Sequence, residues 1–186
     1  MVCPLRIAHR GASLVAPENT LAAFEAAIQE GVDLIEIDVH ASRDGELVVI
    51  HDASLDRTTD RIGAIAELPL ALLREADAGS WFDPKFADQR VPMLTEVLDL
   101  ARHRVPVLIE VKAEHLSQTL LQQVGALGVD EDVVIQSFHA DTIRCVNQIN
   151  PSVPTALLKG RNPDELSASA MRQLAAEVLA IGANAL

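Results

Sequence analysis

The sequence predicts an α/β fold built on a parallel sheet, as in a doubly wound sheet or a β/α barrel. Short runs rich in Val, Ile and Leu alternate along the chain with segments of helical periodicity. Runs this short and this apolar are typical of strands that are buried on both faces of a sheet. Because strands that alternate with helices form βα units, we expect the strands to lie parallel.

Six apolar runs are expected to be strands. They cover Leu5 to His9, Leu34 to Val39, Leu47 to His51, Val107 to Val111, Val133 to Phe138 and Val153 to Leu158. Ala183 to Leu186 would begin a further βα unit. The stretch from Asp52 to Arg90 contains Gly, Pro and the only Trp of the chain. We therefore expect one domain over residues 1–186, with a small inserted subdomain at about residues 46–92.

The helices between these runs have recognisable ends. A helix from Thr20 to Glu30 would stop before Gly31, a residue suited to helix C-caps. Thr95 is expected to cap the next helix. Apolar stripes at helical spacing predict two more helices, at Leu116, Leu120, Val124 and Leu127 and at Ile143, Val146 and Ile149. The last helix is predicted to start with Asn162 as its cap and Pro163 at its first position, with the Glu165 carboxylate able to reach back to the cap.

Composition excludes several classes of function. The chain has 186 residues, of which 49% are hydrophobic, so it can bury one core. Its net charge of -12 argues against a general nucleic-acid binder and against docking on anionic lipid. No apolar stretch is long enough for a transmembrane helix, and no secretory signal is recognisable. Only two cysteines are present, which favours a reducing cytoplasm.

Three carboxylates lie inside apolar runs. Glu36 and Asp38 are two residues apart in LIEIDVH, so they point to the same side of a strand, and Glu110 and Lys112 repeat this spacing in VLIEVK. Burying carboxylates without a partner is costly. The simpler interpretations are a carboxylate that tips into solvent and a local Glu110–Lys112 ion pair. Together the three predict an oxygen-ligand site for Mg²⁺ or Ca²⁺, with Lys112 as a point charge for an anionic substrate.

Two histidines close expected strands in a similar setting. His9 ends the first run and is followed by Arg10, and His51 ends the run LVVIH. A single histidine at a strand end is more often structural. Two of them beside a cation site, at the edge where β/α folds place active sites, favour metal-assisted hydrolysis of a phosphoester. His40, two residues beyond Asp38, is a weaker candidate for a supporting role.

The ordered motifs of the chain resemble those of the glycerophosphodiester phosphodiesterase family. These are HRG at residues 9–11, PENT at residues 17–20, E-x-D at Glu36 and Asp38, DG at Asp44 and Gly45, HD at His51 and Asp52, and E-x-K at Glu110 and Lys112. The stretches LDRTTD, GSWFDPKF, VPMLTEVLDL and QSFH agree with the same family. The resemblance covers essentially the whole chain.

This resemblance implies a TIM-like (β/α)8 barrel with a small insertion after its second strand. Such enzymes hydrolyse deacylated phospholipids to glycerol 3-phosphate and an alcohol. By motif position, Glu36, Asp38 and Glu110 would hold one divalent cation, and His9 and His51 would be the general acid–base pair. Phosphate contacts would come from Arg10 and Lys112. Glu18 and Asn19 of the PENT turn would support the site.

The resemblance departs from the family pattern at the C-terminus. A full barrel takes roughly 250 residues, and the last two βα units of the family have no counterpart after Leu186. We interpret the chain as a truncated product. A catalytically silent fragment is therefore the second hypothesis, and a lyase that forms a cyclic phosphate, as in sphingomyelinase-D-like relatives, is the third. The acid and base assignment, Mg²⁺ against Ca²⁺, the head group and the oligomeric state stay open.

Overall fold

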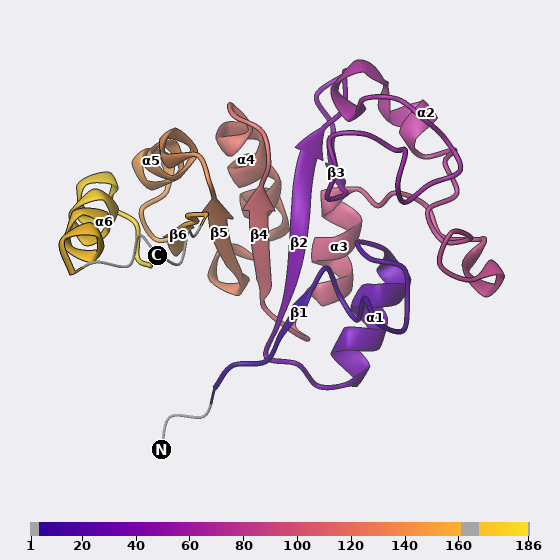
Figure 1. Cartoon of the computed structure of the whole chain (residues 1–186), viewed down its shortest axis with the longest axis horizontal. Coiled ribbons are helices and arrows are strands. Elements are labelled where there is room, and N and C mark those ends of the chain that lie inside the picture. The colour runs from indigo at the N-terminus through magenta and orange to yellow at the C-terminus, as the bar shows by residue number, and fades with distance from the viewer. Residues whose placement is uncertain (1–3, 161–167, 186) are drawn as a thin grey trace.

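The computed structural model describes residues 4–160 and 168–185. Cys3 and the expected helix start at Asn162, Pro163 and Glu165 lie outside the described residues. In Figure 1 the chain passes from β1 near one edge of the sheet to β6 and α6 at the other. No helix in the described ranges combines the length and the apolar character that crossing a bilayer requires.

Within these residues, five parallel strands follow one another across the sheet in sequence order. They are β1 (Ile7–His9), β2 (Leu34–Ala41), β4 (Val107–Val111), β5 (Val133–Ser137) and β6 (Thr155–Leu157). Beyond β6, Ala185 forms an isolated parallel bridge with Ala156. A doubly wound sheet reverses its strand order at a switch point. The unidirectional order therefore indicates a β/α barrel topology.

The helices that connect the parallel strands and the final bridge form a single layer. They are α1 (Leu21–Gln29), α3 (Leu94–Ala101), α4 (Ser117–Leu127), α5 (Ala140–Ile149) and α6 (Ala168–Ile181). Each of these helices contacts the next one in the series. Because a doubly wound fold has helices on both faces of its sheet, this continuous layer also favours the barrel arrangement.

The strand β3 (Leu47–Val49) corrects one expectation. It pairs antiparallel with the end of β2, where Val39 lies opposite Val49 and Ala41 opposite Leu47. The parallel arrangement that its apolar sequence suggested is therefore wrong. The physical reason is the turn at Asp44 and Gly45: Gly45 has a φ of 85°, which reverses the chain within a few residues.

The start of the helix agrees with the sequence at α1 and differs at α3, and the apolar stripe of α5 is only partly buried. The Thr20 hydroxyl accepts a hydrogen bond from the Ala23 N–H, as an N-cap does. Thr95 is not a cap, because α3 begins at Leu94 with Met93 at the N-cap position, and the Glu96 carboxylate accepts a hydrogen bond from the Met93 N–H. The expected apolar stripe of α5 is buried at Ile143 and Val146, whereas Ile149 is 49% exposed.

The main core lies between the sheet and the helices. Along β2, Ile35, Ile37 and Val39 are fully buried in it, so the alternate residues of this strand face the other side of the sheet. A separate apolar cluster, from Val48 to Val91, packs the segment after β3. This segment contains η1 (Ile65–Glu67), α2 (Leu70–Leu73) and η2 (Pro84–Phe86). We propose that it is a small subdomain within a single domain.

Substituting a core residue of β4 tests this packing. Ile109 is fully buried, whereas Ile62 is 83% exposed. We expect Ile109→Ala to lower the free energy of unfolding by about 3 kcal/mol, because it removes buried methyl groups and leaves a cavity. Ile62→Ala is the matched control and should change it by less than about 0.5 kcal/mol. Urea denaturation measures both, and equal effects would contradict the assigned core.

Candidate active site

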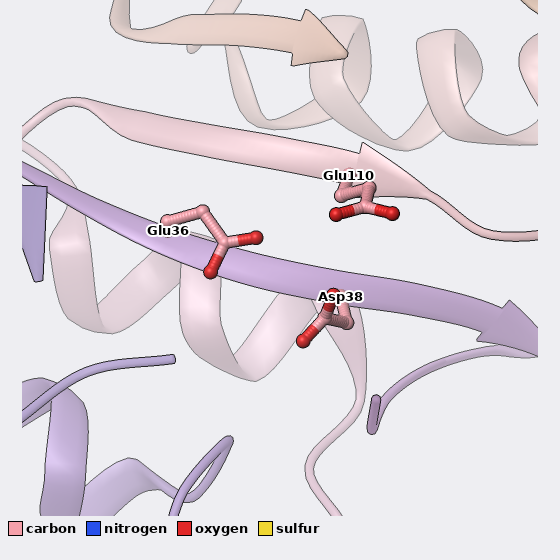
Figure 2. Close-up of side chains that lie close together, drawn as sticks. All are labelled: Glu36, Asp38 and Glu110. Atoms are coloured by element: carbon pink, nitrogen blue, oxygen red, sulfur yellow. The ribbon is translucent and has the colours of Figure 1, made fainter. Parts of the chain in front are cut away.

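Three carboxylates converge on the side of the sheet opposite the main core. Glu36 and Asp38 alternate with the buried isoleucines of β2, and Asp38 lies in register with Glu110 of β4. Figure 2 shows the three side chains close together, with Glu36 and Asp38 on β2 and Glu110 on the neighbouring β4. One oxygen from each carboxylate lies within 4.8 Å of the others, and their residues are at most 8% exposed. The predicted cluster is therefore formed.

The electrostatics of this acidic cluster favour a bound cation. Burial raises the pKa of Glu36 to about 7, and repulsion from Asp38 adds to the shift. Apart from the Lys112 ammonium, 2.9 Å away, the buried Asp38 Oδ1 has no partner. Carboxylate oxygens at this spacing are ligands that Mg²⁺ and Ca²⁺ prefer. The residues present thus fit a divalent cation.

Lys112 and Arg10 partly neutralise the acidic cluster. The Lys112 Nζ lies 2.6 Å from Glu110 Oε1 and 2.9 Å from Asp38 Oδ1. Burial opposes the charged form of Lys112, but hydrogen bonds to Glu110 and Asp38 outweigh it and raise the pKa of Lys112. The Arg10 Nε lies 3.3 Å from Asp38 Oδ2. Both predicted phosphate-contact residues therefore lie at the cluster.

The loop after β1 holds Asp38 and Glu36 through strained backbone. Asn19 donates from Nδ2 to Asp38 Oδ2 over 2.8 Å, and the Arg10 backbone N–H donates to Glu36 Oε2 over 3.0 Å. Arg10 and Asn19 have positive φ values of 60° and 54°. Such conformations are costly for residues with a Cβ and persist where the surroundings impose them. Within the same loop, Glu18 accepts a hydrogen bond from Arg10 Nη1 and so helps to orient the Arg10 guanidinium beside the acidic cluster.

His9 lies at the exposed rim of the acidic cluster. Its Nε2 is 4.0 Å from Glu36 Oε2, and its side chain is 68% exposed. Partial burial and the Arg10 charge lower the pKa of His9, and the His51 charge also contributes. A lowered pKa keeps this imidazole neutral at neutral pH, the form that can accept a proton.

His51 follows β3 and is oriented by its neighbour. Its Nδ1 lies 2.6 Å from Asp52 Oδ1. The His40 ring donates from Nε2 to the His51 carbonyl oxygen over 3.1 Å, which agrees with a supporting role for His40. Because Nδ1 is engaged by Asp52, Nε2 is the His51 nitrogen left for proton exchange.

Arg57 is the residue that sequence reasoning missed. It lies in the stretch LDRTTD and donates to both Asp52 and Glu18. The hydrogen bond from Arg57 is the main reason why the pKa values of both carboxyls are lowered. An arginine five residues after the HD pair was the available signal, but only the tertiary structure shows which carboxylates it contacts.

Comparison with known proteins now places the chain in a family. A model of the glycerophosphoryl diester phosphodiesterase family matches residues 9–184. The chain belongs to this family. It is 39% identical to a glycerophosphodiester phosphodiesterase of Caldanaerobacter subterraneus over 83% of this chain and 66% of the relative. It is 34% identical to one of Bacillus subtilis, over 96% of this chain and 67% of the relative.

Solved structures give the same family. A glycerophosphodiester phosphodiesterase from Agrobacterium tumefaciens has a TM-score of 0.77 at 38% identity, covering 81% of this chain and 65% of that one. A phosphodiesterase from Oleispira antarctica, in complex with the product sn-glycerol-3-phosphate, has a TM-score of 0.79 at 30% identity, covering 98% and 83%. These matches confirm the TIM-like fold, and the chain spans about two thirds of the length of the two curated relatives.

The pKa of Glu36 predicts a pH dependence of stability. Its folded value of about 7 lies above the usual 4.5, so the folded protein binds this proton more tightly than the unfolded chain does. In chelator, the resulting stabilisation is fully present below about pH 4.5. It is lost as the pH rises through about 7, and amounts to about 3 kcal/mol at most.

The variant Glu36→Gln isolates this contribution, because an amide does not ionise. We expect wild type to lose stability relative to Glu36→Gln between about pH 4.5 and pH 7. Denaturant unfolding of both proteins across this range measures the difference. A difference in the free energy of unfolding that stays constant across this pH range would show that folding does not raise the pKa of Glu36.

Proposed function

We propose that this chain catalyses metal-dependent hydrolysis of glycerophosphodiesters, such as glycerophosphocholine or glycerophosphoethanolamine, to sn-glycerol 3-phosphate and an alcohol. The observation that carries the proposal is the buried acidic cluster in contact with two cationic side chains. Membership of the family supports the reaction class. The product bound to the Oleispira relative supports the phosphate product.

In this proposal Glu36, Asp38 and Glu110 hold one divalent cation, either Mg²⁺ or Ca²⁺. Their mutual spacing within 4.8 Å supports a shared ion. When bound, the cation supplies charge stabilisation at the phosphoryl oxygens. Arg10 and Lys112 would bind the remaining phosphate charge, since both already lie beside the acidic cluster.

His9 and His51 would move the protons of the reaction. One imidazole accepts a proton from the attacking water as the water oxygen bonds to phosphorus. The other donates a proton to the alcohol oxygen as its bond to phosphorus breaks. Glu18 and Asn19 would hold Arg10 and Asp38 in place, as their hydrogen bonds to these residues support.

The proposed partner is a small molecule in a cytoplasmic setting. The net charge of -12 disfavours nucleic acid and anionic membrane surfaces as partners. The presence of only two cysteines supports a reducing compartment. A glycerophosphodiester suits this setting, because local cations can bind its phosphate within an acidic protein.

The test is release of sn-glycerol 3-phosphate from glycerophosphocholine by the purified 186-residue chain. We expect turnover with Mg²⁺ or Ca²⁺ and its loss in chelator, because the acidic cluster requires a cation to stabilise the reacting phosphate. His9→Ala serves as the blank. A cyclic phosphate product would instead identify the lyase, and a folded chain without turnover would be the silent fragment.

A histidine pair gives a matched test of proton transfer. We expect His51→Ala to lower kcat by about 100-fold or more while KM changes little. The reason is that the His51 imidazole transfers a proton in the transition state and does not bind the substrate in the ground state. His103→Ala is the control, since exposed His103 precedes β4 at the opposite end of the sheet. Steady-state kinetics compare the two, and equal rates would make His51 structural.

A further inference from the structure

Arg57 makes a pair of bidentate contacts that the proposed mechanism does not yet use. On one edge of its guanidinium, Nε lies 2.7 Å from Asp52 Oδ2 and Nη2 lies 3.1 Å from Asp52 Oδ1. On the other edge, Nη1 and Nη2 lie 2.9 Å and 2.8 Å from the two oxygens of Glu18. A planar five-donor fork can contact both carboxylates in bidentate geometry at once, whereas a lysine ammonium, with three donors, cannot.

Each of these carboxylates also contacts a residue assigned to the reaction. Asp52 Oδ1 lies 2.6 Å from His51 Nδ1. Glu18 Oε1 accepts a hydrogen bond from Arg10 Nη1 over 2.9 Å. Arg57 therefore stands at the middle of an unbroken chain of contacts from the His51 imidazole to the Arg10 guanidinium. The two ends of this chain come from different loops, after β3 and after β1.

We propose that Arg57 is a positioning residue that sets the His51 imidazole relative to the Arg10 guanidinium, acting through Asp52 and Glu18. The proposal rests on the proposed function, which gives His51 its proton transfer and Arg10 its phosphate contact. Without Arg57, Asp52 and Glu18 would each lose two hydrogen bonds and could adopt other rotamers. The imidazole would then lose the fixed acceptor at Nδ1 that leaves Nε2 for the reacting oxygen.

Arg61 provides a matched control for Arg57. It lies four residues further along the same segment and pairs with Glu75 at 3.1 Å. Its side chain is 43% exposed, against 44% for Arg57. Exposed ion pairs contribute little to stability. Arg57→Ala and Arg61→Ala thus remove arginine side chains of nearly equal exposure, but only the contacts of Arg57 lead to the site.

Kinetics give the first test. We expect Arg57→Ala to lower kcat/KM on glycerophosphocholine by roughly 10-fold to 100-fold, the size usual for residues that orient a functional group. Arg61→Ala should stay within about twofold of wild type. Because Arg57 acts through Asp52 and Glu18, we expect Arg57→Ala to lower kcat/KM by a smaller factor in Asp52→Asn or in Glu18→Gln than in wild type. Full additivity in both backgrounds would overturn the proposal.

Histidine ¹⁵N NMR gives a test that needs no turnover. At about pH 8 an ordinary imidazole is neutral, so its two tautomers can be compared. We expect wild type and Arg61→Ala to show His51 protonated at Nδ1, with His51→Gln identifying the signal. Arg57→Ala and the charge-conserving Arg57→Lys should both shift this signal toward a mixture of tautomers, because neither can hold Asp52 as the guanidinium does.

The two measurements separate this proposal from the proposed function. Absence of turnover by wild type would count against the hydrolase, while the tautomer of His51 would still report on Arg57. A His51 signal unchanged in Arg57→Ala would overturn the positioning role, whatever the kinetics show. Loss of the Nδ1–H form in Arg57→Ala and Arg57→Lys, but not in Arg61→Ala, would establish it.

Discussion

Three carboxylates held within 4.8 Å of one another in a buried position impose the main physical constraint on this protein. Carboxylates removed from water favour their protonated form unless cations or hydrogen-bond donors compensate. The raised pKa of Glu36 is the direct expression of this conflict. The strands β2 and β4 maintain the proximity, because Asp38 and Glu110 are register partners in the sheet.

Compensation comes from segments that are far apart in the sequence. Lys112 reaches back to Glu110 and Asp38 from the end of β4, while Arg10 and Asn19 approach Asp38 from the loop after β1. The positive φ values in that loop show that its backbone adopts costly conformations at the residues that contact the acidic cluster. Ion pairs and hydrogen bonds to the acidic cluster therefore determine much of the local structure on this side of the sheet. The apolar core packs against the opposite side.

The antiparallel β3 has a functional consequence. Because the pairing of β2 with β1 ends at Glu36, β3 can run back from the Asp44 turn along the same edge of β2. His51 thereby arrives near the level of Asp38, whose carbonyl accepts the Ile50 N–H. The segment that follows also supplies Arg57, so an insertion in the β/α pattern contributes to the site as directly as the sheet does.

The sequence by itself determined the β/α order, the acidic cluster and the two strand-end histidines, because period-two alternation and strand ends are local properties of the chain. It could not determine the direction of β3, which depends on a single turn, or the start of α3, where Glu96 rather than Thr95 satisfies the backbone. Nor could it reveal Arg57. Its two carboxylate partners are 5 and 39 residues away, and only the packed structure brings them to one guanidinium.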